Sequence, residues 1–110
     1  MRFLATVLAA LMMCVSAAAQ AKGNAENGKA KAAQVCAACH GADGAKPSAP
    51  DQPILAGQHY DYLVKALSDY RSGKRANPIM KAFTSSLSKQ DVEDLAAWFA
   101  SQRSNLHFQR

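Results

Sequence analysis

Cys36-Ala37-Ala38-Cys39-His40 is the most informative stretch of this 110-residue chain. Residues at positions i, i+3 and i+4 lie on one face of a helical turn, so two thiols and an imidazole project to the same side. At this spacing the thiols can reach the two vinyl groups of one porphyrin while the imidazole meets its iron, and C-x-x-C-H is typical of haem attachment. The motif therefore predicts one covalently bound haem c, with Cys36 and Cys39 as thioethers and His40 as an axial iron ligand.

Other uses of the two cysteines remain open. A redox-active dithiol of the thioredoxin type needs a βαβ pattern around it, and the sequence shows none. A structural zinc site needs four ligands, for which His59 and His107 are the remaining histidines. A simple disulfide would leave His40 without a role. Haem attachment is the interpretation that uses the whole motif.

Met80 is the predicted second axial ligand. Haem iron can be held by a histidine together with a methionine, and Met80 is the only methionine beyond the first 21 residues. The segment 74–84 is predicted to be a loop, in which Pro78 restricts the backbone. The alternatives are that Met80 only fills a gap, that His59 is the second ligand, or that the iron is five-coordinate.

Hydrophobic periodicity predicts a small all-α domain. The first helix runs from about residue 24, with Asn24 as its N-cap, into the cysteine motif. The second runs from about residue 58 to Gly73, with apolar residues at helical spacing. The third begins at Ser88, and Asp91 completes a capping box. We expect three main helices and two irregular loops, wrapped around one covalently attached haem: residues 45–53 and 74–84.

The first 21 residues have the pattern of a secretory signal peptide. Arg2 gives a positive start, residues 3–15 are almost entirely apolar, and residues 16–21 are small and cleavable. This order is typical of signal peptides. The apolar run is shorter than the roughly 17–25 residues of a membrane span, so no permanent membrane anchor is expected. Cleavage after Ala19 or Ala21 would leave residues 22–110 as one domain.

The chain has a modest basic excess, with 13 Lys and Arg against 8 Asp and Glu. Without Arg2 the formal charge falls from +5 to +4. Because these charges are spread along the chain, they suit docking to an acidic patch on a protein better than binding to nucleic acid. An ordinary solvated surface is the alternative. The candidate docking residues flank the segment that carries Met80: Arg71, Lys74, Arg75 and Lys81.

These motifs resemble those of the class I c-type cytochromes, most closely bacterial monohaem carriers of the c553 and c4-like kind. The resemblance covers nearly all of residues 22–110. It rests on Gly28, on the cysteine motif followed by Gly41, on Pro53-Ile54-Leu55-Ala56-Gly57-Gln58, on Asn77-Pro78-Ile79-Met80, and on Leu95 with Trp98.

The resemblance implies contacts around the haem. Gly28 would let the first helix cross closely over the last one, at Leu95 and Trp98. The carbonyl of Pro53 would accept a hydrogen bond from the ring nitrogen of His40 that does not bind iron, which fixes the orientation of the imidazole. Leu55 would pack on the porphyrin.

The expected function is electron transport, not catalysis. A His/Met iron has no open coordination position, and the sequence shows neither a carboxylate cluster nor a nucleophile placed near a histidine. We therefore expect a soluble, periplasmic carrier that exchanges single electrons with an oxidase, a reductase or a dehydrogenase. Two rivals remain open. One is a dedicated haem c subunit of a larger oxidoreductase or respiratory complex, and the other is a haem enzyme or gas sensor with a vacant iron site.

Overall fold

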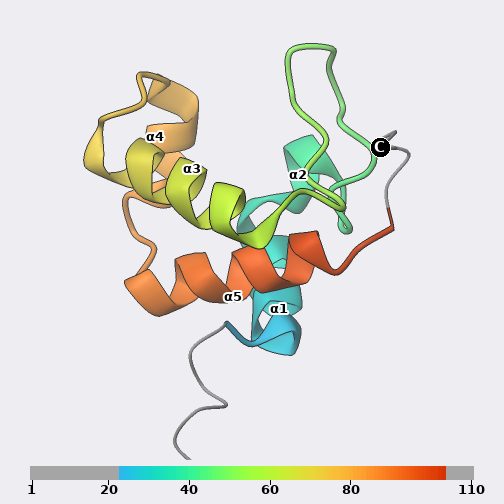
Figure 1. Cartoon of the computed structure of the whole chain (residues 1–110). Coiled ribbons are helices and arrows are strands. Elements are labelled where there is room, and N and C mark those ends of the chain that lie inside the picture. Colours follow the sequence, from blue (N-terminus) through green and yellow to red (C-terminus); the bar gives the residue numbers. More distant parts are fainter. Residues whose placement is uncertain (1–22, 104–110) are drawn as a thin grey trace, which may run out of the picture.

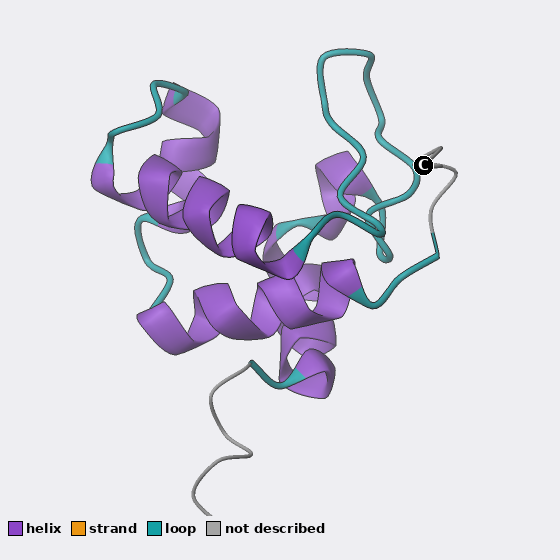
Figure 2. Ribbon diagram, in the orientation of Figure 1, coloured by secondary structure: helices purple, strands orange, loops and turns teal. Residues whose placement is uncertain are grey.

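The computed structural model describes residues 23–103, which form five helices and no strand (Figures 1 and 2). The all-α prediction is confirmed for this range. The predicted signal peptide and His107 lie outside the described residues. The helices are α1 (Ala25–Val35), α2 (Ala37–His40), α3 (Tyr60–Ser72), α4 (Pro78–Thr84) and α5 (Lys89–Ala100).

The predicted helix starts are confirmed at both ends of the domain. The side chain of Asn24 caps α1 by accepting a hydrogen bond of 3.0 Å from the backbone N–H of Asn27. Ser88 and Asp91 form a complete capping box at the start of α5. Each cap satisfies backbone N–H groups that have no partner inside the helix. Local polar side chains therefore fix where these two helices begin.

The segment that carries Met80 is helical. The prediction of an irregular loop over residues 74–84 is wrong for Pro78–Thr84, which forms α4. The side-chain oxygen of Asn77 accepts hydrogen bonds of 3.1 Å from the backbone N–H groups of both Ile79 and Met80. Pro78 occupies the start of the helix, where its missing N–H removes no intrahelical bond. The Asn-Pro pair is therefore a helix start, and seven residues are too few to show a clear helical period.

The domain is held together where α1 crosses α5. A Cβ atom on Gly28 would lie 2.0 Å from the carbonyl oxygen of Asp94 and 2.9 Å from the Cβ of Trp98. The close crossing implied by the resemblance is thus present, and only glycine permits it. The carboxylate of Asp94, whose residue is 5% exposed, accepts hydrogen bonds from the Asn24 backbone at 2.7 Å and from the Gln90 amide at 2.8 Å. These bonds tie the start of α1 to α5.

The hydrophobic core lies around α5. In Figure 1 α3 lies along one side of α5, and α1 crosses it on the other. α4 packs against α3 and has no comparable contact with the α1–α5 pair. Within residues 23–103, no helix is long and apolar enough to cross a membrane. The buried core residues are Ala32, Leu63, Leu87, Val92, Leu95, Ala96 and Phe99.

Candidate haem site

The single turn of α2 positions the cysteine motif. It follows a turn at Cys36, and the backbone N–H of His40 donates to the carbonyl of Cys36 at 3.0 Å. His40 is buried, with 5% exposure, and its Nδ1 lies 2.9 Å from the carbonyl oxygen of Pro53. Because a carbonyl can only accept, Nδ1 carries the proton and Nε2 keeps the lone pair that binds a metal.

The loop after α2 holds Pro53 in place. The carbonyl of Gly44 accepts a hydrogen bond of 2.8 Å from the backbone N–H of Leu55. Gly44 has φ +77°, and a Cβ there would lie 2.7 Å from the ring of Phe99 and 2.9 Å from the Cβ of Leu55. A side chain at this position would be strained and would also push the loop off α5. Gly44 therefore allows the Pro53 carbonyl to reach His40.

A cavity of about 440 Å³ separates α2 and its loop from α3 and α4. This volume is in the range of small-molecule and cofactor sites. His59, the rival ligand, lies at the exposed start of α3 and does not line the cavity. Apolar side chains from α3, α4, α5 and the segment before α5 complete the walls, including Leu63, Leu67, Phe83, Leu87 and Phe99. All six predicted site residues line the cavity: Cys36, Cys39, His40, Pro53, Leu55 and Met80.

Met80 enters this cavity from α4 and is held on both sides. The side-chain oxygen of Asn77 accepts a hydrogen bond from the backbone N–H of Met80. The hydroxyl of Thr84 donates to the backbone carbonyl of Met80 at 2.7 Å. Thr84 is only 2% exposed, and both of these polar residues also line the cavity. Sequence reasoning did not identify Asn77 or Thr84 as residues that position Met80. The Asn-Pro pair was the available signal for Asn77, whereas nothing in the sequence singled out Thr84.

The environment of the cysteines disfavours a redox-active dithiol. Burial raises the pKa of the Cys36 thiol to about 11. A reactive cysteine needs the opposite shift, because the thiolate is the nucleophile. The zinc alternative requires four ligands, and in the part of the chain that the structure describes no group of three His, Cys, Asp or Glu side chains could hold a metal ion.

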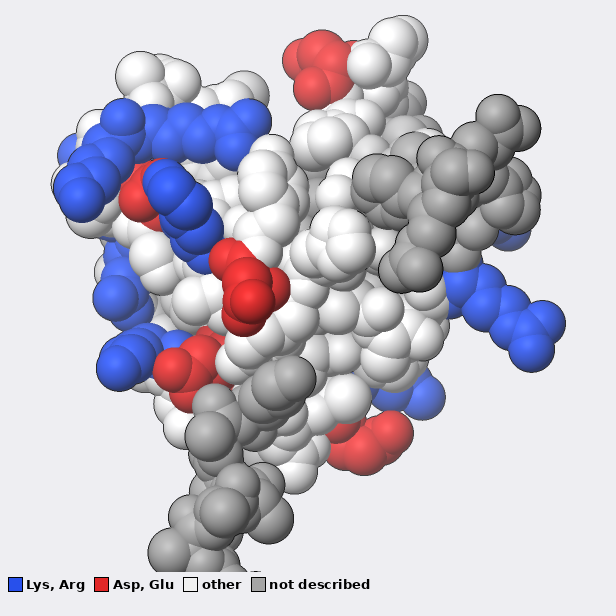
Figure 3. Space-filling view, in the orientation of Figure 1, with Lys and Arg blue, Asp and Glu red and all other residues white. Residues whose placement is uncertain are grey.

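The predicted basic residues do not form one uniform set. The guanidinium of Arg71 donates to the carbonyl of Leu87 at 3.1 Å, which ties α3 to the segment before α5. Lys74, Arg75 and Lys81 are all exposed, but Arg75 also lies over the ring of Tyr70. Figure 3 shows Lys and Arg side chains gathered over the end of the molecule formed by α3 and α4. Arg71 thus has a structural contact that the sequence did not indicate.

The rim of the cavity also exposes large apolar side chains. Ile79 is 65% exposed, Tyr62 51% and Phe83 45%, and all three also line the cavity. Large exposed apolar patches commonly mark interaction sites. The α3–α4 side of the cavity therefore combines apolar and cationic side chains at the surface.

The donors around the cavity fit haem c. Two thiols can bond to the vinyl groups, the imidazole nitrogen of His40 and the thioether of Met80 can serve as iron ligands, and apolar walls can cover the macrocycle. Small haem proteins that carry electrons hold their iron in this way. The fold and the site together therefore define a c-type haem protein of the electron-carrying class.

Comparisons with known proteins agree with this class. Residues 25–103 match the family model described as Cytochrome c. Cytochrome c4 from Pseudomonas aeruginosa is 50% identical over 93 residues, which are 84% of this chain and 45% of that protein. The thiosulfate dehydrogenase electron acceptor of Stutzerimonas stutzeri is 42% identical over 87 residues, or 79% of this chain and 40% of that protein. The crystal structure of reduced recombinant cytochrome c4 from Pseudomonas stutzeri superposes with a TM-score of 0.69 at 42% identity, covering 76% of this chain and 48% of that one.

The chain belongs to the cytochrome c family. It carries haem c through Cys36, Cys39 and His40, and the resemblance to class I carriers of the c4 kind is confirmed. Members of this family carry electrons and are not catalytic. The chain spans about half the length, or less, of the curated relatives named here.

Proposed function

We propose that this chain is a periplasmic electron carrier whose haem iron is held between Nε2 of His40 and the sulfur of Met80. The observation that carries the proposal is that these two side chains line one cavity from different helices. Hydrogen bonds also fix the ring of His40 and the backbone of Met80. The bound haem would supply a one-electron couple at its iron.

The surrounding residues keep both axial ligands in place. The Pro53 carbonyl fixes the ring of His40 and raises its basicity as a ligand. Asn77 and Thr84 hold the backbone of Met80 on either side, and Leu55, which lines the cavity, would pack on the porphyrin. With His40 and Met80 both bound, small molecules would be excluded from the iron. The ligand geometry then changes little between oxidation states, as a fast carrier requires.

The exposed α3–α4 rim suits a redox partner with an acidic docking patch. Tyr62, Ile79 and Phe83 offer apolar contact beside the cavity, while Lys74 and Lys81 add positive charge. Protein interfaces commonly combine an apolar centre with a polar rim, and complementary charge speeds encounter. The relative named as an electron acceptor of thiosulfate dehydrogenase supports a dehydrogenase as one class of partner, beside an oxidase or a reductase.

The periplasmic location rests on the signal-peptide pattern of residues 1–21. The mass of the purified holoprotein should correspond to a chain cut after Ala19 or Ala21 with one haem attached. Expression without these residues should give little holoprotein, because the chain would not be exported. A full-length holoprotein that retains residues 1–21 would contradict this part of the proposal.

Replacing the sixth ligand tests the proposal. Met80→Ala should lower the reduction potential, open the iron to carbon monoxide, and abolish the sulfur-to-iron charge-transfer band of the oxidised protein. Met80→His is the matched control, since it keeps the iron six-coordinate but removes the thioether that raises the potential. Haem should stay attached in both variants, because the cysteines are unchanged. If Met80→Ala keeps the band and the parent potential, another residue is the ligand, and His59 is the first to test.

A further inference from the structure

We infer that Arg75 binds a propionate of the haem at the rim of the cavity and thereby raises the reduction potential. The inference rests on the haem site proposed above. The two propionates of haem lie on the edge of the macrocycle away from its vinyl groups. Because Cys36 and Cys39 would hold the vinyl edge beside α2, the propionates would be directed away from α2. An ionised carboxylate at the edge of an apolar site needs a hydrogen-bonding partner.

Arg75 is the one cation in position to meet this need. Among the Lys and Arg side chains of residues 23–103, only Arg75 lines the cavity. A guanidinium is planar and offers paired N–H donors that match the two oxygens of a carboxylate. Asp51 also lines the cavity, from the loop that follows α2, but it bears the same charge as a propionate. It therefore cannot take the place of Arg75.

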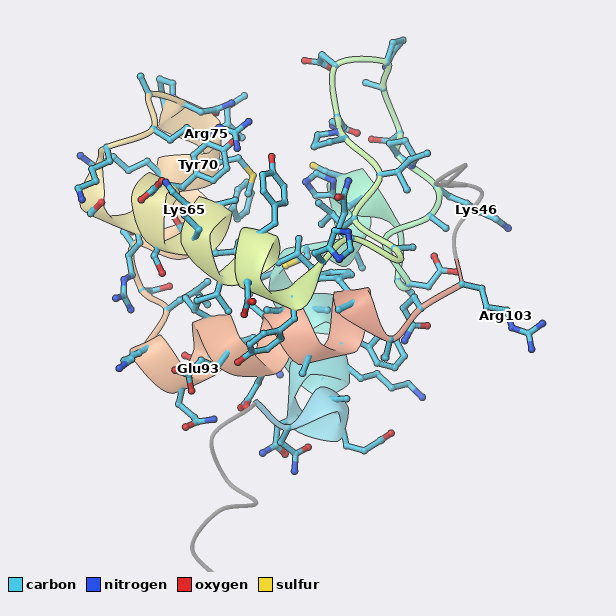
Figure 4. All side chains as sticks on the ribbon, viewed as in Figure 1. Lys46, Lys65, Tyr70, Arg75, Glu93 and Arg103 are labelled. Atoms are coloured by element: carbon cyan, nitrogen blue, oxygen red, sulfur yellow. The ribbon has the colours of Figure 1, made fainter. Side chains whose placement is uncertain are left out.

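Three contacts hold Arg75 in position. Its backbone N–H donates to the carbonyl of Asp69 at 3.1 Å, and its guanidinium carbon lies 4.8 Å from the centre of the Tyr70 ring. Its Nη1 donates to the hydroxyl oxygen of Tyr62 at 3.5 Å. Tyr62 and Tyr70 line the cavity as well. Figure 4 shows Arg75 and Tyr70 together on the α3–α4 side of the molecule, across from α2.

This arrangement leaves donors for a carboxylate. Stacking on Tyr70 uses the flat face of the guanidinium, so the N–H groups along its edge stay available. The Tyr62 hydroxyl accepts from Arg75 and keeps its own proton to donate. Guanidinium and hydroxyl together would therefore form a site for one carboxylate at the rim, made by side chains of α3 and of the segment that follows it.

The assignment gives Arg75 a different role from the neighbouring cations. A positive charge paired with the propionate favours the reduced haem, which carries one positive charge less than the oxidised haem. Lys74 is the preceding residue in the chain, and both side chains are exposed, but only Arg75 lines the cavity. Arg75 would thus act on the cofactor, whereas Lys74 and Lys81 would act on the partner.

The test compares two holoproteins that lose one positive charge at adjacent positions. Arg75→Gln should lower the equilibrium constant for reduction several-fold in an optical redox titration. It should also shift the propionate bending band in the resonance Raman spectrum, because the carboxylate loses its hydrogen bonds. Lys74→Gln is the matched control and should leave both observables nearly unchanged, since Lys74 does not line the cavity and water and salt screen its charge from the haem.

Two results would overturn the assignment: equal shifts of potential in the two variants, or an unchanged propionate band in Arg75→Gln. The sulfur-to-iron band separates this failure from failure of the proposed ligation. If that band persists while Arg75→Gln changes neither potential nor propionate band, only the role of Arg75 is wrong. If the parent protein lacks the sulfur-to-iron band, the ligation by Met80 is wrong, and the Raman comparison still decides the assignment of Arg75.

Discussion

The two walls of the haem cavity are built in different ways. The His wall, residues 36–58, contains the buried His40 and a loop fixed by backbone hydrogen bonds. The Met wall, residues 62–84, consists of α3, a connecting turn and the short α4, and its rim exposes large side chains such as Ile79. Cys36 and Cys39, which attach the haem, also lie on the His wall. We infer that the His wall attaches the cofactor, while the Met wall sets its potential and meets the partner.

Removing both thioethers should produce the largest effect. Cys36→Ser combined with Cys39→Ser should give a colourless chain that is poorly folded or degraded, because the haem fills the cavity and nothing else attaches it covalently. Absorption spectra and circular dichroism measure this outcome. The contrast is with Met80→Ala on the Met wall, which should keep its haem. A stable, fully folded double variant without haem would contradict the role given to the His wall.

A methyl group at the α1–α5 crossing should have the next largest effect. Gly28→Ala should destabilise the holoprotein by about 3 kcal/mol, the upper part of the range for overpacking, since the new Cβ would lie 2.0 Å from a backbone oxygen that cannot rotate away. Denaturant unfolding measures the change. The sulfur-to-iron band should persist under native conditions, because the crossing lies outside the Met wall.

Ala30→Ser, at an exposed position of the same helix, is the control for this variant. It should change the free energy of unfolding by less than about 0.5 kcal/mol. Equal stability of Gly28→Ala and the parent would show that the crossing is looser than the structure has it.

The two asparagine caps separate ligand positioning from general stability. Asn77→Ala and Asn24→Ala each remove an N-cap side chain, which should cost about 1 kcal/mol. Of these two asparagines, only Asn77 holds the backbone of Met80. Asn77→Ala should therefore lose the sulfur-to-iron band at a temperature below global unfolding, whereas Asn24→Ala should lose the band and the fold together. The same thermal behaviour in both variants would argue against a separate Met wall.

The smallest effect is expected at the start of α5, away from both ligands. The backbone N–H of Ser88, with its side chain and Lys31, lowers the pKa of Asp91 below its ordinary value. Because the folded-state pKa lies below the unfolded one, the stabilisation is complete above the unfolded pKa of about 3.9 and is lost as the pH falls through the folded value.

Asp91→Asn should thus reduce stability by about 0.3–1 kcal/mol at pH 7, the range for a negative charge near a helix N-terminus, and its deficit should shrink in acid. Denaturant unfolding at pH 7 and at a pH below the unfolded pKa of about 3.9 measures the change in this deficit. The reduction potential should not change. A deficit of constant size across the acid range would show that the charge of Asp91 does not contribute.

The sequence predicts the two walls to different extents. Cys36, Cys39 and His40 are predictable because their chemistry lies within five consecutive residues, where helical spacing alone sets the geometry. Asn24, Ser88 and Asp91 are predictable because a cap is a local interaction. Met80 stands out as a candidate only because no other methionine lies beyond residue 21.

The Met wall was less predictable because its contacts join separate segments. α4 was missed since the Asn-Pro pair at its start also occurs in loops, and its apolar side chains face a cofactor cavity and not a protein core. The contact of Arg75 with Tyr62 spans 13 positions, and that of Arg71 with Leu87 spans 16. No sequence period encodes such contacts. They arise only when the turn after α3 has folded back.

An optical redox titration of the holoprotein tests the central claim, a one-electron carrier with a His40/Met80 iron, most directly. We predict a single one-electron transition, with the sulfur-to-iron band present in the oxidised protein and lost in step with reduction. Carbon monoxide should bind the reduced protein poorly, because both axial positions are closed. A titration in which that band is absent throughout, or in which the reduced iron binds carbon monoxide readily, would contradict the account.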